Sequence, residues 1–350
     1  MAQVIPRTMR KLVASRLSQK FREVVEIKEV PVPSPGDGEV LIKNKFVGIN
    51  ATEINFTAGR YDPNVKPPLD IGFEGMGEVV GVGSNTKLKP GQPVMYMSYG
   101  AFAEYKIVPA RAVIPLPSLS AAYIPFLVSG MTASIALEKV GDLKSGETVL
   151  ITAAAGGTGQ FAVQWAKQAG CHVIGTCSTP EKVEFLKKIG CDRPINYKTE
   201  NLRSVLKSEY PKGVDIIYES IGGDIFETCI DSLAVKGRLI VIGFIEGYKS
   251  DLGFTPSRTI ATLPVKLLKK SASVRGFFLE HFRRDTPMYA TKMIDMYNKG
   301  TLKSFVDLGE TSEKGKFSGL LGISDAVDYL YSQKSIGKIV VDLDATSSKL

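Results

Sequence analysis

A glycine-rich turn at residues 154–159, with the sequence AAGGTG, is the part of the chain best suited to hold a phosphate group. An apolar run, Val149–Ala153, precedes the turn, and a segment with helical periodicity, Gln160–Ala169, follows it. Strand, turn and helix in this order form the first half of a dinucleotide-binding unit. The alternative is a tight strand–helix turn that binds no ligand. We favour a dinucleotide site.

Each residue of this turn has a separate physical role in such a site. Gly156 permits the tight turn, Gly157 lets the backbone approach a phosphate, and Gly159 lets the helix pack close to the strand. Thr158 lies between them. The free N–H groups and the positive dipole end of the helix then face the pyrophosphate.

The end of the next expected strand, His172–Thr176, indicates which dinucleotide binds. An NAD site places Asp or Glu there, about 20 residues after the glycines, but this strand continues into Cys177, Ser178 and Thr179. Ser178 can donate a hydrogen bond to a 2′-phosphate, and Lys182 can supply the opposing charge. Ser178–Pro180 is also typical of a helix start, and both interpretations can hold together. NADPH is therefore the predicted cofactor.

The alternation of strands and helices predicts the architecture. Residues 127–299 alternate between the two and indicate an α/β fold with a doubly wound parallel sheet, a Rossmann domain. Residues 1–126 and 300–350 are expected to form a β-rich second domain, with the active site between the two domains. Ser220 follows one expected strand and Ile242 ends another. Ligands of open α/β sheets bind at these strand ends. The expected Rossmann strands are Val149–Ala153, His172–Thr176, Val214–Glu219 and Leu239–Ile242, and the expected helices are Gln160–Ala169, Glu181–Ile189, Leu202–Glu209 and Phe226–Leu233. The long stretch Glu246–Lys270 is expected to be a loop with a helical end.

Composition excludes several other classes. Hydrophobic residues make up 44% and charged residues 23% of the chain, as in ordinary globular proteins, and no apolar run reaches the length of a membrane span. The net charge of +8 is spread along the chain, so neither nucleic acid nor a membrane is expected as a partner. The four cysteines form no CxxC pair and the two histidines are far apart, which predicts buried free thiols and no metal site.

The chain resembles the medium-chain dehydrogenase/reductase superfamily. Residues 72–77, GFEGMG, are similar to its GHExxG signature, and the AAGGTG turn follows at the usual distance. Zinc-dependent members take ligands from the histidine of that signature and from a cysteine in a GxCGTD motif, where this chain has Phe73 and Asn50. Neither residue is a ligand that catalytic zinc prefers. The resemblance therefore implies the zinc-free branch, with a GroES-like catalytic domain beside the Rossmann domain.

Within that branch, which includes quinone oxidoreductases and prostaglandin reductases, similarity to the prostaglandin reductases covers nearly the whole chain. It includes the blocks FVGINATEINFTAGRYDP and CDRPINYKTE. The resemblance implies further cofactor contacts from Thr132, Tyr197, Tyr248, Phe277, Phe278 and Leu279. As plain core residues these side chains would be unremarkable. One departure is Ser335, where the family tends to carry an asparagine near the nicotinamide.

The implied activity is NADPH-dependent reduction of the 13,14 double bond of 15-oxo-prostaglandins, without a metal. Such an enone reductase must stabilise negative charge that grows on the carbonyl oxygen. Tyr61 is the first candidate donor, because its phenol keeps its proton at neutral pH. Asn50 is the second, through its amide. Tyr61 could instead be a surface aromatic and Asn50 a turn residue, and the final proton could come from water.

Two alternative functions stay open. An NADPH:quinone oxidoreductase would use the same cofactor site with a flatter acceptor pocket. An NADPH-binding sensor or scaffold would turn over little. The family also implies a homodimer that forms through the edge strands of the Rossmann sheets.

The two ends of the chain resemble targeting signals that suggest where in the cell the protein is located. The last residues, Ser348-Lys349-Leu350, match the signal read by the peroxisomal import receptor, so a peroxisomal location is expected. The basic residues before Glu23 resemble a mitochondrial transit segment, although Lys11–Leu17 also fits a first strand. Mitochondrion and cytosol are the alternatives.

Overall fold

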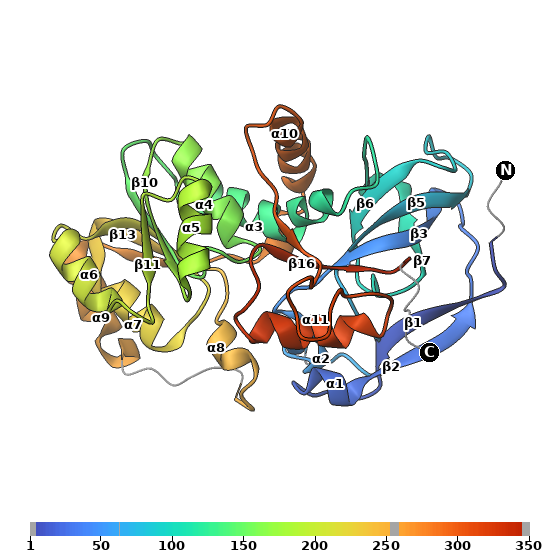
Figure 1. The fold of residues 1–350 in the computed structure, drawn as a ribbon, viewed down its shortest axis with the longest axis horizontal. Coiled ribbons are helices and arrows are strands. Elements are labelled where there is room, and N and C mark those ends of the chain that lie inside the picture. The colour runs from blue at the N-terminus through green and yellow to red at the C-terminus, as the bar shows by residue number, and fades with distance from the viewer. Residues whose placement is uncertain (1–4, 63, 253–258, 345–350) are drawn as a thin grey trace. The chain divides into compact units, whose positions relative to one another are not determined.

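The computed structural model describes residues 5–62, 64–252 and 259–344. The chain divides into two compact units: unit 1 is Met1–Val128 with Val306–Leu350, and unit 2 is Ser129–Phe305. The chain enters and leaves unit 2 a few residues after the crossing points predicted from the sequence, 126/127 and 299/300. Figure 1 labels many of the elements of both units.

Unit 2 contains one six-stranded sheet in the order β11-β10-β9-β12-β13-β14. Neighbouring strands are parallel throughout, which confirms the predicted Rossmann sheet. The strands are β9 Thr148–Ile151, β10 His172–Cys177, β11 Arg193–Asn196, β12 Val214–Glu219, β13 Leu233–Val241 and β14 Ser273–Gly276. The helices are α3 Val128–Ile135, α4 Gly159–Gln168, α5 Pro180–Lys188, α6 Leu202–Glu209, α7 Gly223–Asp231, α8 Ile245–Tyr248, α9 Thr259–Lys270 and α10 Thr286–Asn298. Short helical turns lie at η3 Ala136–Val140 and η4 Leu279–Phe282.

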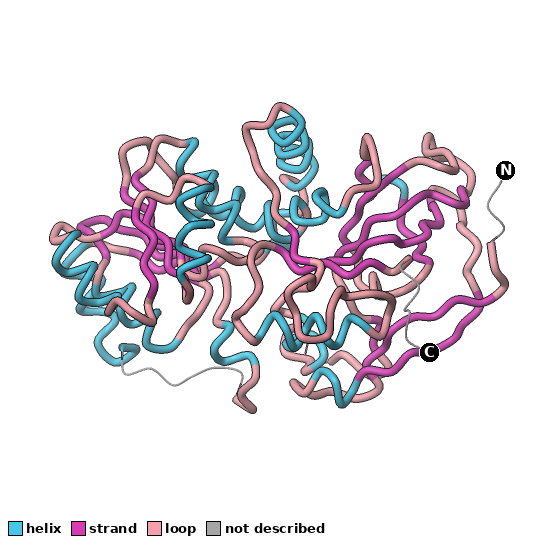
Figure 2. The backbone as a smooth tube through the Cα atoms, in the orientation of Figure 1, coloured by secondary structure: helices cyan, strands magenta, loops and turns pink. Residues whose placement is uncertain are grey.

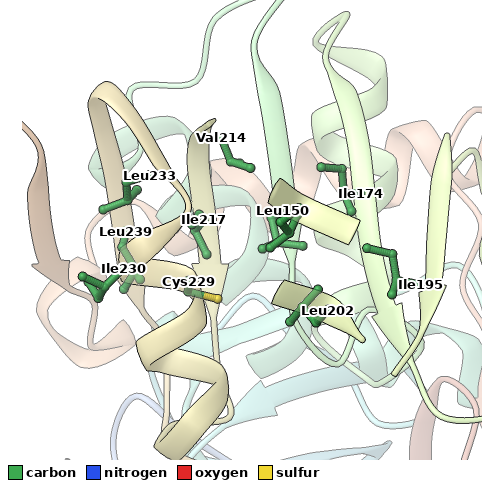
Figure 3. Packing of buried hydrophobic residues seen from close by; sticks show 11 residues of the cluster. Leu150, Ile174, Ile195, Leu202, Val214, Ile217, Cys229, Ile230, Leu233 and Leu239 are labelled. Carbon is green, nitrogen blue, oxygen red and sulfur yellow. The ribbon is translucent and has the colours of Figure 1, made fainter. Parts of the chain in front are cut away.

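One face of this sheet packs against helices α6 and α7. The apolar side chains of the central strands, among them Leu150, Ile174 and Ile217, contact Leu202 of α6 and Cys229 of α7 in a single buried cluster (Figure 3). Burying these side chains holds the strands in register and so fixes where each strand ends. All four cysteines are buried free thiols, as predicted.

The sequence-based prediction missed two strands of this sheet, β11 and β14, which are its two edges. β11 contains Pro194, and β14 is only partly buried, so neither shows the continuous apolar run of a central parallel strand. The strand expected at Leu239–Ile242 is longer in the structure. This strand, β13, begins at Leu233, where a helix was expected to end. Glu246–Lys270 is not a loop throughout: α8 and α9 occupy part of it, and 253–258 lie outside the described residues.

Unit 1 is built from β-strands, as predicted for the GroES-like domain (Figure 2). Its larger sheet runs β15-β16-β3-β5-β6-β8, with β7 also paired to β3, and a smaller sheet runs β2-β1-β4. The strands are β1 Thr8–Ala14, β2 Val25–Pro31, β3 Glu39–Gly48, β4 Leu69–Asp70, β5 Glu74–Val82, β6 Pro93–Met97, β7 Tyr105–Pro109, β8 Val113–Pro115, β15 Val306–Asp307 and β16 Lys338–Asp342. The helices are α1 Phe21–Val24, α2 Glu53–Thr57 and α11 Gly322–Tyr331, with helical turns η1 Ala110–Ala112 and η2 Ala121–Phe126.

One helical stretch, Ala121–Val140, is long and apolar enough to cross a membrane by length and composition. The expectation that no run reaches that length was therefore wrong. However, 83% of its most apolar window is buried inside the protein, as in the core helix of a globular fold.

Candidate active site

The glycine-rich turn joins β9 to α4 in unit 2. Ala153 has a left-handed backbone, with φ of 48°, and the N–H of Gly156 donates to its carbonyl oxygen at 3.0 Å. A Cβ on Gly159 would lie 2.5 Å from the Ala153 oxygen. Only glycine fits there, so α4 begins close against the end of the strand.

The ends of β10 and β11 bring three predicted cofactor residues together. Ser178 follows β10 and is buried, and the backbone N–H of Tyr197 donates to the oxygen of Cys177 at 3.1 Å. Thr179 caps α5 by accepting the N–H of Lys182 at 3.3 Å. Both interpretations of Ser178–Pro180 therefore remain compatible, because Thr179 forms the cap and leaves Ser178 at the strand end.

The other strand ends of the sheet form a continuous row. Ser220, after β12, donates its backbone N–H to the Thr152 hydroxyl after β9 at 2.9 Å. The N–H of Ile242 donates to the Glu219 carbonyl at 2.7 Å, and that of Phe277 to the Val241 carbonyl at 3.0 Å. The structure thus places Ser220, Ile242 and Phe277 side by side at the carboxyl edge of the sheet, where ligands of such folds bind.

The remaining predicted residues of unit 2 differ in exposure. Phe278 is 42% exposed, and Leu279 begins the helical turn η4 after it. Tyr248 is buried, and its ring packs edge-on against Phe244 with centroids 4.9 Å apart. The Tyr248 hydroxyl accepts the N–H of Phe244 at 3.4 Å, which favours a role in shaping this loop. Thr132 is buried within α3.

Sequence reasoning missed Glu219, the last residue of β12. Its fully buried carboxylate accepts the N–H of Ile221 at 2.7 Å and that of Gly222 at 3.1 Å, and so holds the turn that contains Ser220. Burial raises the pKa of Glu219 to about 7, although the backbone N–H groups oppose the rise. An acid directly after the apolar run 216–218 of a central strand was the available signal.

In unit 1, Tyr61 belongs to a small hydrogen-bonded group around α2. Its hydroxyl bonds to the hydroxyl of Thr52, and Asn55 donates to it at 3.3 Å. Arg60 in turn donates to Asn55 at 2.9 Å. We call Thr52 and Tyr61 the hydroxyl pair. Tyr61 is 40% exposed, so its phenol is both held in place and accessible. Thr52 and Asn55 were not predicted from the sequence.

Asn50 is buried and fully engaged with two charged groups. Its amide nitrogen donates to Glu74 Oε1 at 3.0 Å, and its amide oxygen accepts from Lys338 Nζ at 2.6 Å. These contacts favour a positional role for Asn50. Direct donation from the Asn50 amide to a substrate stays a prediction. We call Asn50, Glu74 and Lys338 the buried triad.

Phe73 lies in a group of three rings. Its centroid is 5.2 Å from that of Phe56 and 4.9 Å from that of Tyr99, and Phe56 stacks on Tyr99 at 4.9 Å. Phe56 is one helical turn from Thr52, because its N–H donates to the Thr52 oxygen at 3.0 Å. This aromatic trio, Phe56, Phe73 and Tyr99, therefore adjoins the hydroxyl pair. Within the described residues, no group of three or more His, Cys, Asp or Glu side chains could hold a metal ion.

The fold and this site have close counterparts among known proteins. Residues 36–118 match the alcohol dehydrogenase GroES-like domain family, and residues 157–298 match the zinc-binding dehydrogenase family. The chain is 56% identical to prostaglandin reductase-3 of Mus musculus, over 99% of this chain and 93% of that protein. It is 45% identical to a probable quinone oxidoreductase of Leishmania amazonensis, over 97% of this chain and 99% of that protein.

Solved structures agree with the sequence relatives. Escherichia coli quinone oxidoreductase complexed with NADPH superposes with a TM-score of 0.81 at 27% identity, over 95% of this chain and 99% of that one. The matched family includes zinc-dependent members, but this chain carries Asn50 and Phe73 at the positions of their catalytic ligands. The chain belongs to the zinc-free, quinone-oxidoreductase-like branch of the medium-chain dehydrogenase/reductase superfamily, the branch that contains prostaglandin reductase-3.

Proposed function

We propose that the protein is an NADPH-dependent enone reductase that saturates the 13,14 double bond of 15-oxo-prostaglandins. The observation that carries this proposal is its 56% identity to prostaglandin reductase-3 across 99% of the chain. The geometry is compatible with it, because unit 1 holds the hydroxyls of Thr52 and Tyr61 in one hydrogen-bonded pair.

The residues of unit 2 fit NADPH. Gly159 lets α4 begin close against the end of the strand, so the N–H groups at the start of α4 would face a pyrophosphate. Ser178 and Lys182 would bind the 2′-phosphate, with Tyr197 beside them. When bound, NADPH supplies the hydride that adds to the β-carbon of the enone. Two of the similar solved structures contain NADPH.

The hydroxyl pair would act on the carbonyl oxygen of the substrate. Asn55 donates to the Tyr61 oxygen, and when the Thr52 hydroxyl donates to it as well, the phenol proton is left for another acceptor. Tyr61 would donate it as a hydrogen bond while negative charge grows on that oxygen, and Thr52 would hold the phenol in place. A proton from water then adds to the α-carbon, which completes the saturated ketone.

The test is the loss of NADPH absorbance with 15-oxo-prostaglandin E2, a short-chain enone and a quinone, each assayed with NADPH and with NADH. We expect fast turnover of the prostaglandin with NADPH alone. Turnover confined to quinones would favour an NADPH:quinone oxidoreductase, which the 45% identity to the Leishmania amazonensis protein supports. Binding of NADPH without any turnover would favour a sensor or scaffold and contradict both enzymes.

We also propose that the protein forms a homodimer through β14. This strand ends the sheet, and its outer edge has no partner strand among the described residues. An unpaired strand edge is a template for pairing with a second copy. Sedimentation equilibrium of the wild type and of Val274→Pro tests this. A monomeric wild type would contradict the proposal, and a dimer that persists in the variant would place the interface elsewhere.

A peroxisomal location is proposed from the terminal Ser348-Lys349-Leu350. Deletion of Leu350 should leave activity unchanged and abolish import when the protein is expressed in cells. Import that persists without Leu350 would show that the tripeptide is not the address. Colocalisation of the full chain with mitochondria would favour the N-terminal segment instead.

A further inference from the structure

The buried triad contains the most buried ion pair among the described residues. Lys338 Nζ lies 2.5 Å from Glu74 Oε1, and the two side chains are 3% and 0% exposed. They begin β16 and β5, which flank β3 in the larger sheet of unit 1. A Cβ on Gly48 of β3 would collide with the Glu74 carboxylate, so this glycine makes room for the pair.

Neither charge of the pair lacks a partner. Glu74 Oε1 accepts from Asn50 and Lys338, and Oε2 accepts the backbone N–H of Val128 at 2.9 Å. Lys338 also donates to the Asn50 oxygen. Removing one member of such a buried pair leaves an uncompensated charge, which is strongly destabilising. The triad is therefore rigid in geometry and sensitive to substitution.

A second acid, Glu53, lies beside the triad. Glu53, the first residue of α2, is 1% exposed, and neither of its carboxyl oxygens has a hydrogen-bond partner among the described residues. Burial raises the pKa of Glu53 well above its usual range, and the Lys338 ammonium only partly offsets this. Burial therefore disfavours a second anion beside Lys338.

The triad holds the turn that opens α2. The N–H of Glu53 donates to the Asn50 carbonyl at 3.2 Å, and the Tyr331 hydroxyl of α11 donates to the Ala51 carbonyl at 2.6 Å. Thr52 lies between Ala51 and Glu53, which these two hydrogen bonds anchor. The position of its hydroxyl, and hence its bond to Tyr61, depends on the turn being held.

We propose that Lys338 is a positioning residue: its buried ammonium fixes Asn50, and through the Asn50–Glu53 turn it sets the hydroxyl pair in the geometry needed for turnover. The proposal rests on the proposed function, in which the hydroxyl pair stabilises the developing oxyanion. Lys338 is 288 residues from Asn50 in the chain, and it acts on the hydroxyl pair through the Asn50 amide that it holds.

The first experiment compares Lys338→Met with the double variant Lys338→Met/Glu74→Gln, which contains no buried charge in the triad. The single variant should lose stability. The double variant should regain most of it, because no unpaired carboxylate remains, while kcat for the enone stays about tenfold or more below wild type. The dissociation constant for NADPH, measured by fluorescence titration, should not change.

Glu147→Gln is the matched control. It breaks the Glu147–Arg238 pair, whose side chains are 19% and 12% exposed and lie in unit 2 at the opposite end of the strands from the glycine turn. It should lower stability and leave kcat unchanged. If kcat of the double variant recovers together with its stability, Lys338 is only structural and the proposal is wrong.

A crystal structure of the double variant tests the proposal without relying on turnover. The Asn50–Glu53 turn should shift, and the Thr52 and Tyr61 hydroxyls should separate. A preserved hydroxyl pair would overturn the positioning role. Wild-type inactivity toward every acceptor, with the pair displaced in the variant, would instead contradict the proposed function and leave the positioning role supported.

Discussion

The hydroxyl of Thr52 is hydrogen-bonded to the hydroxyl of Tyr61, which lies nine residues further along the chain. Thr52 precedes α2 and Tyr61 lies in the loop after it, so this short helix and its loop bring the two together. Asn55, inside the helix, contacts the same phenol. A tyrosine that the sequence could place only in a loop thus has a defined orientation.

The phenol of Tyr61 should matter for turnover and not for cofactor binding. Tyr61→Phe removes the donor to the enone oxygen, so kcat should fall by about tenfold to a hundredfold while the dissociation constant for NADPH stays near wild type. Thr52→Val should have a smaller effect of the same kind. Steady-state kinetics with the prostaglandin enone measure this, and an unchanged kcat for Tyr61→Phe would remove Tyr61 from the mechanism.

Lys182 should distinguish NADPH from NADH. Lys182→Met keeps the aliphatic stem but removes the charge proposed to face the 2′-phosphate, so the dissociation constant for NADPH should rise about tenfold or more and that for NADH should not. Lys187→Met is the matched control on the same helix, because its ammonium pairs with Glu184 at 2.8 Å at the other end of α5. Equal losses for both cofactors would argue against the assignment of Lys182.

The aromatic trio should select acceptors with long apolar chains. Phe56, Phe73 and Tyr99 offer ring surface beside the hydroxyl pair, and such surface binds apolar chains by burial. Tyr99→Ala should raise KM for 15-oxo-prostaglandin E2 about fivefold or more, in line with the roughly 1–3 kcal/mol expected for an aromatic contact, and leave KM for a short-chain enone unchanged. Parallel increases for both acceptors would show that the trio supports the fold and does not select substrates.

Glu219 should make stability depend on pH near neutrality. Because its folded pKa is about 7, above the usual value for glutamate, the folded protein holds a proton that the unfolded chain has lost between roughly pH 4.5 and pH 7. Stability from this group is therefore present at acid pH and lost as the pH rises through 7, by on the order of 3 kcal/mol at most.

Glu219→Gln should flatten this dependence, since glutamine does not titrate. The single tryptophan, Trp165, is 4% exposed and gives an intrinsic fluorescence signal for urea unfolding between pH 5 and pH 8. A variant whose free energy of unfolding still falls over this range by as much as wild type would show that another group is responsible.

The arrangement of the cofactor-binding candidates in unit 2 follows from local patterns in the sequence. The spacing of Gly156 and Gly159 between an apolar run and a helical segment is such a pattern, and local patterns dictate local backbone geometry. Because parallel strands of one sheet end at the same edge, the positions of Ser178, Ser220 and Ile242 in the chain were enough to predict that they lie there. The edge strands β11 and β14 could not be predicted in this way, since edges lack the apolar run that identifies buried strands.

The arrangement of the buried triad and the aromatic trio in unit 1 arises only when the chain folds. Lys338 and Asn50 are 288 residues apart, and no periodicity relates them; the sheet brings them together by pairing β16 with β3, which ends just before Asn50. The same holds for the ring contacts of Phe73 with Phe56 and Tyr99, which come from three separate segments. Side-chain contacts between distant segments depend on how strands pair and pack, and that information is not contained in any single stretch of the chain.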